Sequence, residues 1–376
     1  MAVPAPGPLT APHGSDITQL AQLDDGSAVV TADLHGGLRL WPALDGTREP
    51  VVINAPVAKA LAVVHDGDGF TIAALDAAGG LHVIRTSATG AVRDRLTPPG
   101  SFSQLEATRD RLLALRTDQT IDVLGPGGKL VANLPAEPGS HVDAIVTRGT
   151  RALALVLEDR RTHGRWIDLA SGAAWGKATR PLDGPVASAA LSPDGTLLVI
   201  NRPKSVRPVL FDLATGALRP TPTCVAKGWP KSEGFDMDEA EILREGTAPI
   251  AIGFVSDAVI ACSVLTQLSW WSVNGEAVPS AGGGMLIGTS PTAVSERGVV
   301  AAMATNLGLA SMIHTKFLGY GLHNVEHLYA GPGGTLAGSD AGLLELGSDL
   351  AARGRFEINR ARDWTAAVPL GDRYAV

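Results

Sequence analysis

The stretch Ala190-Leu-Ser-Pro-Asp-Gly195-Thr-Leu-Leu-Val199, followed by Phe211-Asp-Leu-Ala-Thr-Gly216, decides how this chain folds. Its first part reads as an apolar strand, a turn that ends in Asp-Gly, and a second apolar strand. Asp-Gly adopts positive φ at little cost, which a tight hairpin requires. The second part is a strand that ends in an aromatic-Asp pair, followed by a polar turn with glycine. Together they predict consecutive antiparallel strands joined by short turns.

Both parts recur along the chain at one spacing. The strand-turn-strand pattern returns at residues 21–30 and, more loosely, at residues 144–153, which lie 46 residues before the 190–199 copy. Ile167-Asp168-Leu-Ala-Ser-Gly172 repeats the second part 44 residues earlier. Spacings near forty residues are typical of one four-stranded propeller blade. The predicted starts of the innermost strands are Ile17, Val57, Phe102, Val142, Val186, Ile250, Thr292 and Val325.

This order of strands and turns resembles the WD-repeat proteins over residues 15–376, and it is also similar to divergent quinoprotein-like propellers. The resemblance implies an all-β fold, a β-propeller of four-stranded antiparallel blades. Eight blades are expected, with seven as the alternative. No Gly-His or Trp-Asp dipeptide occurs, and the nearest matches are Trp166-Ile-Asp168 and Phe211-Asp212. The sequence therefore lacks the dipeptides that mark the hydrogen-bonded tetrad, which holds the blades together in the strict WD-repeat family.

Composition agrees with this fold and excludes some function classes. Hydrophobic residues make up 45% of the chain and aromatic residues only 5%, so Ala, Val and Leu must build the core. The net charge of −7 argues against nucleic-acid binding, which needs clustered Lys and Arg. No run of 18 apolar residues is present, so no membrane span is expected. The Ala-, Gly- and Arg-rich composition suggests a bacterial source.

The chain is expected to form one propeller over residues 15–376, preceded by a disordered Pro/Ala-rich segment, residues 1–14. The start lacks the basic and apolar regions of a signal peptide, so a cytoplasmic location with reduced thiols at Cys224 and Cys262 is predicted. A ninth unit begins near Trp364 and is incomplete. Either these strands close the ring with the N-terminal segment, or the sequence is truncated or processed.

One interval is too long for a blade. Val186 and Ile250 are 64 residues apart, and the excess forms an acidic insertion at about residues 223–248. Asp236 is a candidate N-cap of a short helix with one apolar face. The insertion is either a self-packed loop or a partner-binding element. The candidate partner-binding residues are Trp229, Phe235, Asp236, Met237, Ile242 and Leu243.

Motifs of catalytic, metal and phosphate sites match this sequence only superficially. His323-Asn-Val-Glu326-His327 matches a zinc-peptidase string, but that site needs a helix, and the flanking glycines predict a strand. The segments 125–130 and 172–179 lack phosphate-loop spacing and are predicted to be hairpin turns. No catalytic, cofactor or metal residues are therefore assigned. Polar residues that could reach a central channel are Asp16, His141, Asp143, Glu326 and Asp363. Of Trp270 and Trp271, one is expected in the core and the other between blades or at the outer edge.

The function that these observations favour is a non-catalytic interaction scaffold or regulatory subunit. It would bind a partner protein through propeller loops and the 223–248 insertion, without a cofactor. The alternative is a channel-centred hydrolase or small-ligand binder, lactonase-like, with a metal in the central channel. Converging carboxylates would favour the alternative, and a channel lined by Ala, Val and Thr would argue against it.

Overall fold

The computed structural model places most of the chain in β-strands. The residues that the structure describes are 13, 17–23, 25–41, 50–158, 161–169, 173–182, 186–202, 205, 207–220, 251–264, 267–278, 292–295, 298–303, 306–310, 315–318, 327–331, 334–339, 342–346, 352–356, 368–370 and 373–375. In this part of the chain, the helical content is a single 3-10 turn, η1 (Pro126–Gly128).

The strands fall into consecutive antiparallel sheets, each built from one stretch of chain. The first three sheets are β1 (Ile17–Gln22), β2 (Val29–Asp33), β3 (Gly37–Trp41) and β4 (Val51–Asn54); β5 (Ala58–Asp66), β6 (Gly69–Asp76), β7 (Leu81–Thr86) and β8 (Val92–Leu96); and β9 (Phe102–Ala107), β10 (Leu112–Arg116), β11 (Ile121–Leu124) and β12 (Leu130–Leu134). The next two are β13 (His141–Arg148), β14 (Arg151–Glu158), β15 (Arg161–Asp168) and β16 (Ala174–Leu182); and β17 (Ser188–Leu191), β18 (Leu197–Asn201), β19 (Val209–Asp212) and β20 (Leu218–Arg219).

Two further sheets complete the ring, and two lie beyond it along the chain. The ring sheets are β21 (Ala251–Ser256), β22 (Val259–Val264) and β23 (Gln267–Ser272); and β24 (Thr292–Ser295), β25 (Gly298–Met303), β26 (Asn306–Ala310) and β27 (Thr315–Leu318). The remaining sheets are β28 (His327–Gly331), β29 (Gly334–Ser339), β30 (Gly342–Leu346) and β31 (Ala352–Phe356), and the hairpin β32 (Val368–Leu370) with β33 (Arg373–Ala375).

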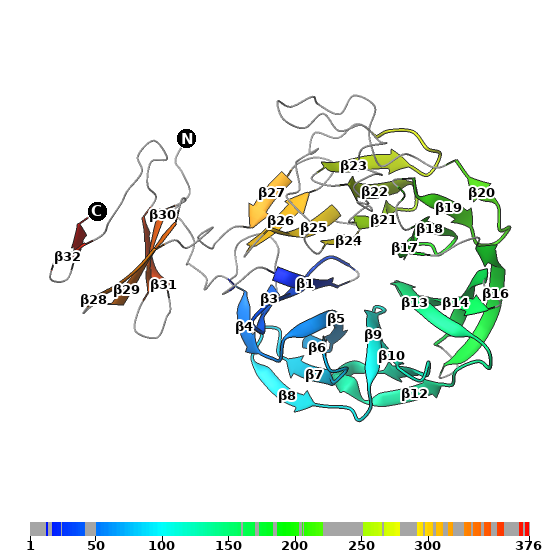
Figure 1. Cartoon of the computed structure of the whole chain (residues 1–376), viewed down its shortest axis with the longest axis horizontal. Coiled ribbons are helices and arrows are strands. Elements are labelled where there is room, and N and C mark those ends of the chain that lie inside the picture. Colours follow the sequence, from blue (N-terminus) through cyan, green and yellow to red (C-terminus); the bar gives the residue numbers. More distant parts are fainter. Residues whose placement is uncertain are drawn as a thin grey trace.

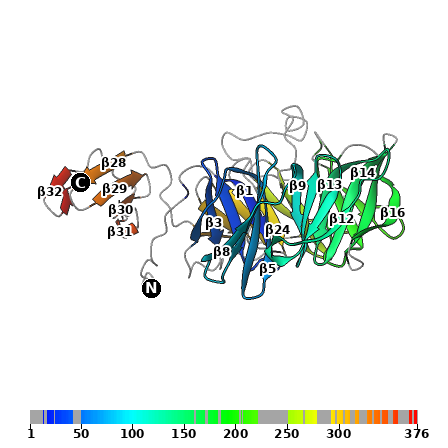
Figure 2. The ribbon, with the colours of Figure 1, turned by 90° about the horizontal axis from the view of Figure 1, so that it is seen from below.

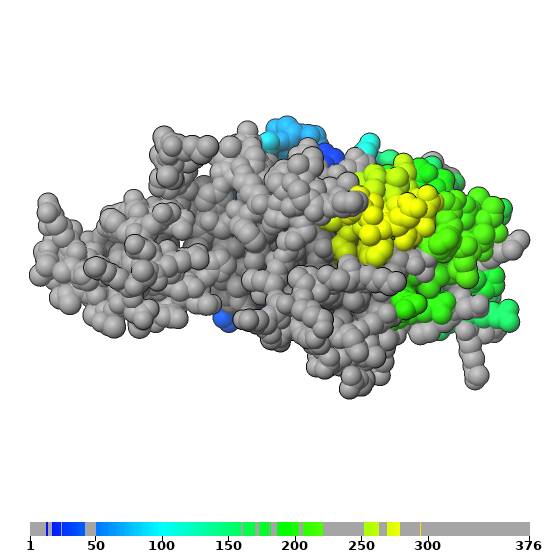
Figure 3. Space-filling model, turned by 90° about the horizontal axis from the view of Figure 1, so that it is seen from above, coloured from blue at the N-terminus to red at the C-terminus, as the bar shows by residue number. Residues whose placement is uncertain are grey.

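The first strand of each ring sheet faces a common centre (Figure 1). Strands β1, β5, β9, β13, β17, β21 and β24 each neighbour the next, and β24 and β25 neighbour β1. The predicted β-propeller of four-stranded antiparallel blades is confirmed. Figure 3 shows two adjacent blades, blade 5 in green and blade 6 in yellow, side by side.

Eight blades were expected from the sequence, with seven as the alternative. Among the described strands, seven sheets stand around the centre, and the sheet β28–β31 lies beside the ring in two views (Figures 1 and 2). That sheet does have the four strands that the repeat predicted, and β28 starts two residues after the expected Val325. The spacing in the sequence predicted where blades begin, but it could not show how many of them fit around one axis.

The core lies between neighbouring blades. Leu197 and Val199 of blade 5 pack with Phe254, Ile260 and Cys262 of blade 6 in one buried cluster. Similar clusters join blades 1 and 2, 2 and 3, 3 and 4, and 4 and 5. The middle strands are buried on both faces, as β2 shows with five buried residues in succession. Small Ala, Val and Leu side chains allow these sheets to approach closely.

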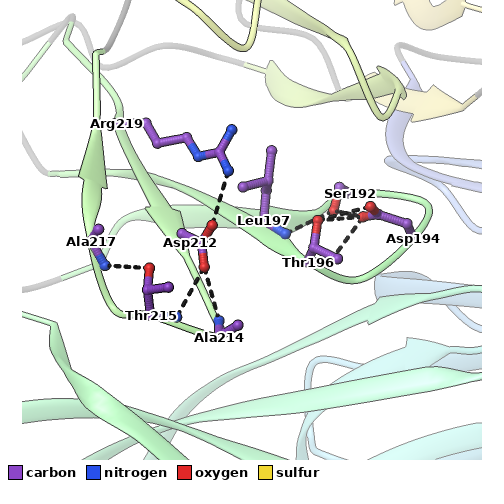
Figure 4. Close-up of polar contacts among 9 residues, drawn as sticks. All are labelled: Ser192, Asp194, Thr196, Leu197, Asp212, Ala214, Thr215, Ala217 and Arg219. Atoms are coloured by element: carbon purple, nitrogen blue, oxygen red, sulfur yellow. Dashed lines mark hydrogen bonds and ion pairs between the residues drawn. The ribbon is translucent and has the colours of Figure 1, made fainter.

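Asp residues organise the two turns that mark the repeat (Figure 4). The Asp194 carboxylate accepts bonds from the Ser192 hydroxyl and from the Thr196 backbone N–H, at 2.6 and 2.9 Å. Asp212 accepts from the backbone N–H groups of Ala214 and Thr215 and pairs with Arg219 at 2.9 Å. The bonds from Thr215, and then Arg219, lower the pKa of Asp212 to about 2. The repeated Asp therefore fixes the turn geometry in its ionised form.

Blade 1 contains a buried polar network, although the sequence lacks the Gly-His and Trp-Asp dipeptides that would have indicated one. The His13 Nδ1 atom lies 2.9 Å from an Asp33 carboxylate oxygen, and its Nε2 atom lies 2.7 Å from the Thr31 hydroxyl. Trp41 Nε1 donates to the same hydroxyl at 2.9 Å. His13 belongs to the segment expected to be disordered, yet its side chain is buried. Residues 1–12 and 14 lie outside the described part of the chain.

The structure contradicts the prediction that Cys262 carries a reduced thiol. Cys262 is fully buried in β22 and it is disulfide-bonded, so the predicted reduced thiol is wrong at this position. The other cysteine of the sequence, Cys224, lies outside the described residues.

The blade 1 network gives a direct test of the fold. Thr31→Val keeps the side-chain shape but leaves His13 Nε2 and Trp41 Nε1 without their partner. We expect the free energy of unfolding to fall by about 2–4 kcal/mol, because each orphaned buried polar group costs about 1–3 kcal/mol. Chemical denaturation measures it, with Thr89→Val in an exposed turn as the control. Equal stabilities of the two variants would show that the network contributes nothing.

Candidate functional site in the central channel

The inner strands surround a cavity of about 250 Å³. Its walls come from the ends of β1, β9 and β13, the middle of β5, and Val294 of β24. A second cavity of about 150 Å³ lies against β13, β17, β21 and β24. The two share Glu106, Thr147, Arg148 and Val294. Most of the remaining lining is Leu, Ala, Val and Ile.

Three polar side chains converge on the larger cavity. Gln22 is the last residue of β1, Glu106 is the second-last of β9, and Arg148 is the last of β13. Arg148 is buried, and its Nη1 donates to the Val294 carbonyl at 3.3 Å. This bond joins blade 4 to blade 7, which are not neighbours around the ring.

The buried polar groups of Glu106 and Gln22 are poorly compensated by the described residues around them. Burial raises the pKa of Glu106 from 4.5 to about 7, and burial is the sole cause of the shift. Both amide atoms of the Gln22 side chain are buried without a hydrogen-bond partner among the described residues. Buried polar groups in native proteins are almost always hydrogen-bonded, and the exceptions point to water, an ion or a function. The Glu106 carboxyl and the Gln22 amide could therefore each bind a further group inside the cavity.

The channel residues expected from the sequence are placed differently. His141 and Asp143 lie at the start of β13, where His141 Nε2 and Asp143 Oδ1 are 3.8 Å apart and the His141 side chain is exposed. They do not line either cavity, which β13 reaches with its last four residues, 145–148. Asp16, Glu326 and Asp363 lie outside the described residues. The partner-binding candidates that also lie outside them are Trp229, Phe235, Asp236, Met237, Ile242 and Leu243.

Sequence reasoning missed Gln22, Glu106 and Arg148. The available signal was their common place in the repeat, because each is a polar residue at or next to the end of an apolar inner strand. Among the described residues, no three His, Cys, Asp or Glu side chains are close enough to share a metal ion. The arrangement offers one carboxyl, one guanidinium and one amide, which can bind polar groups of a small molecule.

The described strands also test the predictions for the zinc-peptidase string, the two glycine-rich segments and the tryptophan pair. His327 opens β28, as the strand interpretation of the zinc-peptidase string predicted, while His323 and Glu326 lie outside the described residues. The segment 125–129 is the turn between β11 and β12, as predicted. The hairpin turn predicted at 172–179 is wrong for residues 174–179, which belong to strand β16. Trp271 packs in the core cluster of blades 5 and 6, and Trp270 packs on the opposite side against Val294 of blade 7. Both are therefore buried between blades.

Comparison with known proteins supports the fold alone. The solved structure "Complex of KlAtg21 with coiled-coil of AgAtg16" is similar, with a TM-score of 0.52 and 11% identity, over 80% of this chain and 98% of that chain. Similar folds occur in 1284 solved chains, so the architecture does not single out an activity. No family model matches the sequence. The search of curated proteins finds no match either.

The carboxyl in the channel predicts an unusual pH dependence of stability. The pKa of Glu106 is raised in the folded protein, so its contribution is fully present below about pH 4.5 and is lost as the pH rises to about 7. The loss is at most about 3.5 kcal/mol, since the pKa rises from 4.5 to about 7 and one pKa unit corresponds to about 1.4 kcal/mol. Glu106→Gln should remove it and be more stable than the wild type at pH 8.

Urea denaturation at pH 5 and pH 8 measures this difference. Glu158→Gln, at an exposed position at the end of β14, is the matched control and should keep the wild-type change between the two pH values. If Glu106→Gln and the wild type lose the same stability over this range, the carboxyl is solvated and not buried.

Proposed function

We propose that this protein is a non-catalytic interaction platform that binds a partner protein. The observation that carries the proposal is a row of exposed apolar side chains on the outermost strands of three successive blades, β4, β8 and β12. We call it the outer row, and it consists of Val52, Val92, Leu96, Leu130 and Val131. These five are most of the large exposed hydrophobic side chains among the described residues. Clustered exposed apolar side chains are typical of interaction sites.

The outer row lies on a firmly assembled part of the rim. Gly90, in the turn before β8, approaches Val51 of blade 1 so closely that a Cβ atom there would lie 2.5 Å from its methyl carbon. Gly128, in the turn before β12, approaches Val83 of blade 2 at 2.7 Å on the same measure. The turns that lead into β8 and β12 therefore pack directly against the preceding blade. The outward backbone edges of the outermost strands have no strand partner in these sheets and could also pair with an extended peptide.

Two further considerations support partner binding. The similar solved structure is a complex with a coiled coil, so this architecture presents a partner surface in at least that protein. The acidic insertion at about residues 223–248 is our second proposed contact element, with Trp229, Phe235, Asp236, Met237, Ile242 and Leu243 as its contact residues. Its aromatic and aliphatic side chains are of the kinds found in the centres of interfaces.

We also infer that the propeller is of the WD-repeat kind rather than the quinoprotein-like kind. The network of His13, Asp33, Thr31 and Trp41 supports this, because a tetrad of such groups locks blades in the strict WD-repeat family. A regulatory subunit without a cofactor, and without nucleic acid as a partner, remains the role that the acidic composition favours.

Site-specific photocrosslinking tests the partner surface. A photoreactive residue at Leu96 in the outer row should give a discrete crosslinked product in cells of the native host, and one at Trp229 tests the insertion in the same way. Leu218 is the matched control, because it is also an exposed leucine on an outermost strand but belongs to blade 5. Adducts at none of the three positions, or the same adducts at Leu218, would contradict the proposed surfaces.

The cellular compartment remains a proposal. No helix among the described residues is long and apolar enough to cross a membrane. The cytoplasmic location expected from the sequence start is opposed by the disulfide at Cys262, because disulfides persist mainly in oxidising compartments. We expect Cys224 to be its partner, since the sequence has no other cysteine.

Thiol labelling distinguishes the two locations. Protein taken from the native host into denaturant with an alkylating reagent should show no free thiol, and it should show two after reduction. Purified protein should also be destabilised by reductant, by about 2–4 kcal/mol for a disulfide of ordinary strength. Two alkylated cysteines in the unreduced sample would instead support the cytoplasmic location.

A further inference from the structure

The larger channel cavity contains one acidic group that no described residue compensates. Glu106 enters the cavity from β9 and also lines the second cavity. Burial is the sole cause of the rise in its pKa, so no hydrogen bond and no charge from the described residues acts on this carboxyl group. A carboxylate in such a place is stabilised when a positive group binds beside it.

Arg148 also lines this cavity, but its guanidinium is engaged elsewhere. Its Nη1 donates to the Val294 carbonyl at 3.3 Å, and the side chain has a further interaction beyond this bond. Arg148 does not lower the pKa of Glu106, so its charge is not felt at that carboxyl. A cation bound beside Glu106 would for the same reason meet little repulsion from Arg148. The unmet charge of the cavity is therefore a single negative one.

The turns next to the cavity hold further charged residues, and these contact other groups. The pairs are Asp25 with His65, Asp66 with Arg85, Asp68 with Arg93, and Asp110 with Arg111, and Arg109 has an interaction as well. None of them changes the pKa of Glu106. The other described lining residues from β1, β5 and β24 are uncharged.

The Gln22 amide is the second group in the cavity without a partner. Its oxygen and its nitrogen are both buried, and neither forms a hydrogen bond with the described residues. The oxygen can accept a hydrogen bond from a donor inside the cavity. An occupant with one positive group that carries several N–H donors would therefore match both Glu106 and Gln22.

The volume of the cavity limits the size of that occupant. Water takes about 30 Å³ per molecule, so a cavity of about 250 Å³ holds a cluster of waters or one small organic molecule. Part of the wall is apolar and suits a short aliphatic chain. This part is formed by Leu20, Leu61, Val63 and Val294.

We propose that this cavity binds a small primary amine with a short aliphatic chain. The ammonium group contacts the Glu106 carboxylate and the Gln22 amide oxygen, and the chain lies against the apolar wall. An ammonium group has three N–H donors, so it can make both contacts at once. The inference goes beyond the proposed function, which concerns a partner protein on the outer row and not the channel.

Binding of an amine at Glu106 should depend on pH. The ammonium group requires an ionised Glu106, and the pKa of this carboxyl is about 7 in the free protein. Binding should therefore weaken by about tenfold as the pH falls from 8 to 6, while the alkylamine itself stays protonated like a lysine. The bound amine should also release protons from the protein near pH 7, which calorimetry in buffers of different ionisation enthalpy detects.

The test uses the full chain and probes that differ in one property at a time. Propylammonium carries the positive charge, 1-propanol is a neutral molecule of similar size, and propionate carries the opposite charge. Sodium and potassium ions supply a positive charge without an alkyl chain. At about 10 mM, propylammonium chloride should raise Tm and give a calorimetric binding isotherm, and the other probes should not.

Substitutions in the cavity wall locate the bound amine. Glu106→Gln removes the charge and keeps the size of the side chain, so it should weaken binding at least about tenfold. Gln22→Leu removes one neutral hydrogen bond and should weaken binding less, by about threefold. Glu158→Gln, at an exposed position at the end of β14, is the matched control and should bind like the wild type.

Each other outcome overturns the proposal. If propylammonium does not bind, the cavity holds only water. If 1-propanol binds as tightly, the site recognises the alkyl chain and not the charge, and if sodium or potassium binds as tightly, the site takes a metal cation. Equal binding by Glu106→Gln and the wild type would place the amine elsewhere. Since the readout is binding to the purified chain, the result is independent of whether the outer row binds a partner protein.

Discussion

Face-to-face packing between neighbouring sheets is the constraint on which the rest of this structure depends. Each blade is one consecutive stretch of chain, and its middle strands are buried on both faces. A single blade has no other way to cover these faces, so blades are stable only beside other blades. The ring supplies two neighbours to every sheet, and the seventh sheet meets the first directly through β24, β25 and β1. In the described part of the chain this junction is made by packing, without a strand exchanged between the two sheets.

The same constraint determines where function can lie. Residues between blades are committed to the core, which leaves the turns, the outermost strands and the inner ends of the first strands for binding. The outer row lies on outermost strands, and Gln22, Glu106 and Arg148 lie at inner-strand ends. The outer row and the channel cavity therefore lie on different parts of the ring, and substitutions in one need not disturb the other.

Much of the fold could be predicted from the sequence because turns carry local signals. Asp-Gly at residues 194–195 and the aromatic-Asp pair at residues 211–212 specify backbone geometry within a few residues. The eight predicted strand starts all lie within two residues of the first strand of a sheet, although the eighth of these sheets lies beside the ring. Blade number could not be obtained in this way, because it depends on the packing angle between sheets. The site was missed for a related reason. His141 and Asp143 lie at the start of an inner strand, and Glu106 lies near the end of another, and only the assembled ring shows which end borders a cavity.

The bond from Arg148 to Val294 has a consequence for passage through the molecule. It runs from the fourth blade to the seventh, and its two residues line both cavities. The guanidinium therefore lies where the two cavities adjoin and links two blades that are not neighbours around the ring. Any solute that passes along the axis between these cavities must therefore come close to this guanidinium and its carbonyl partner.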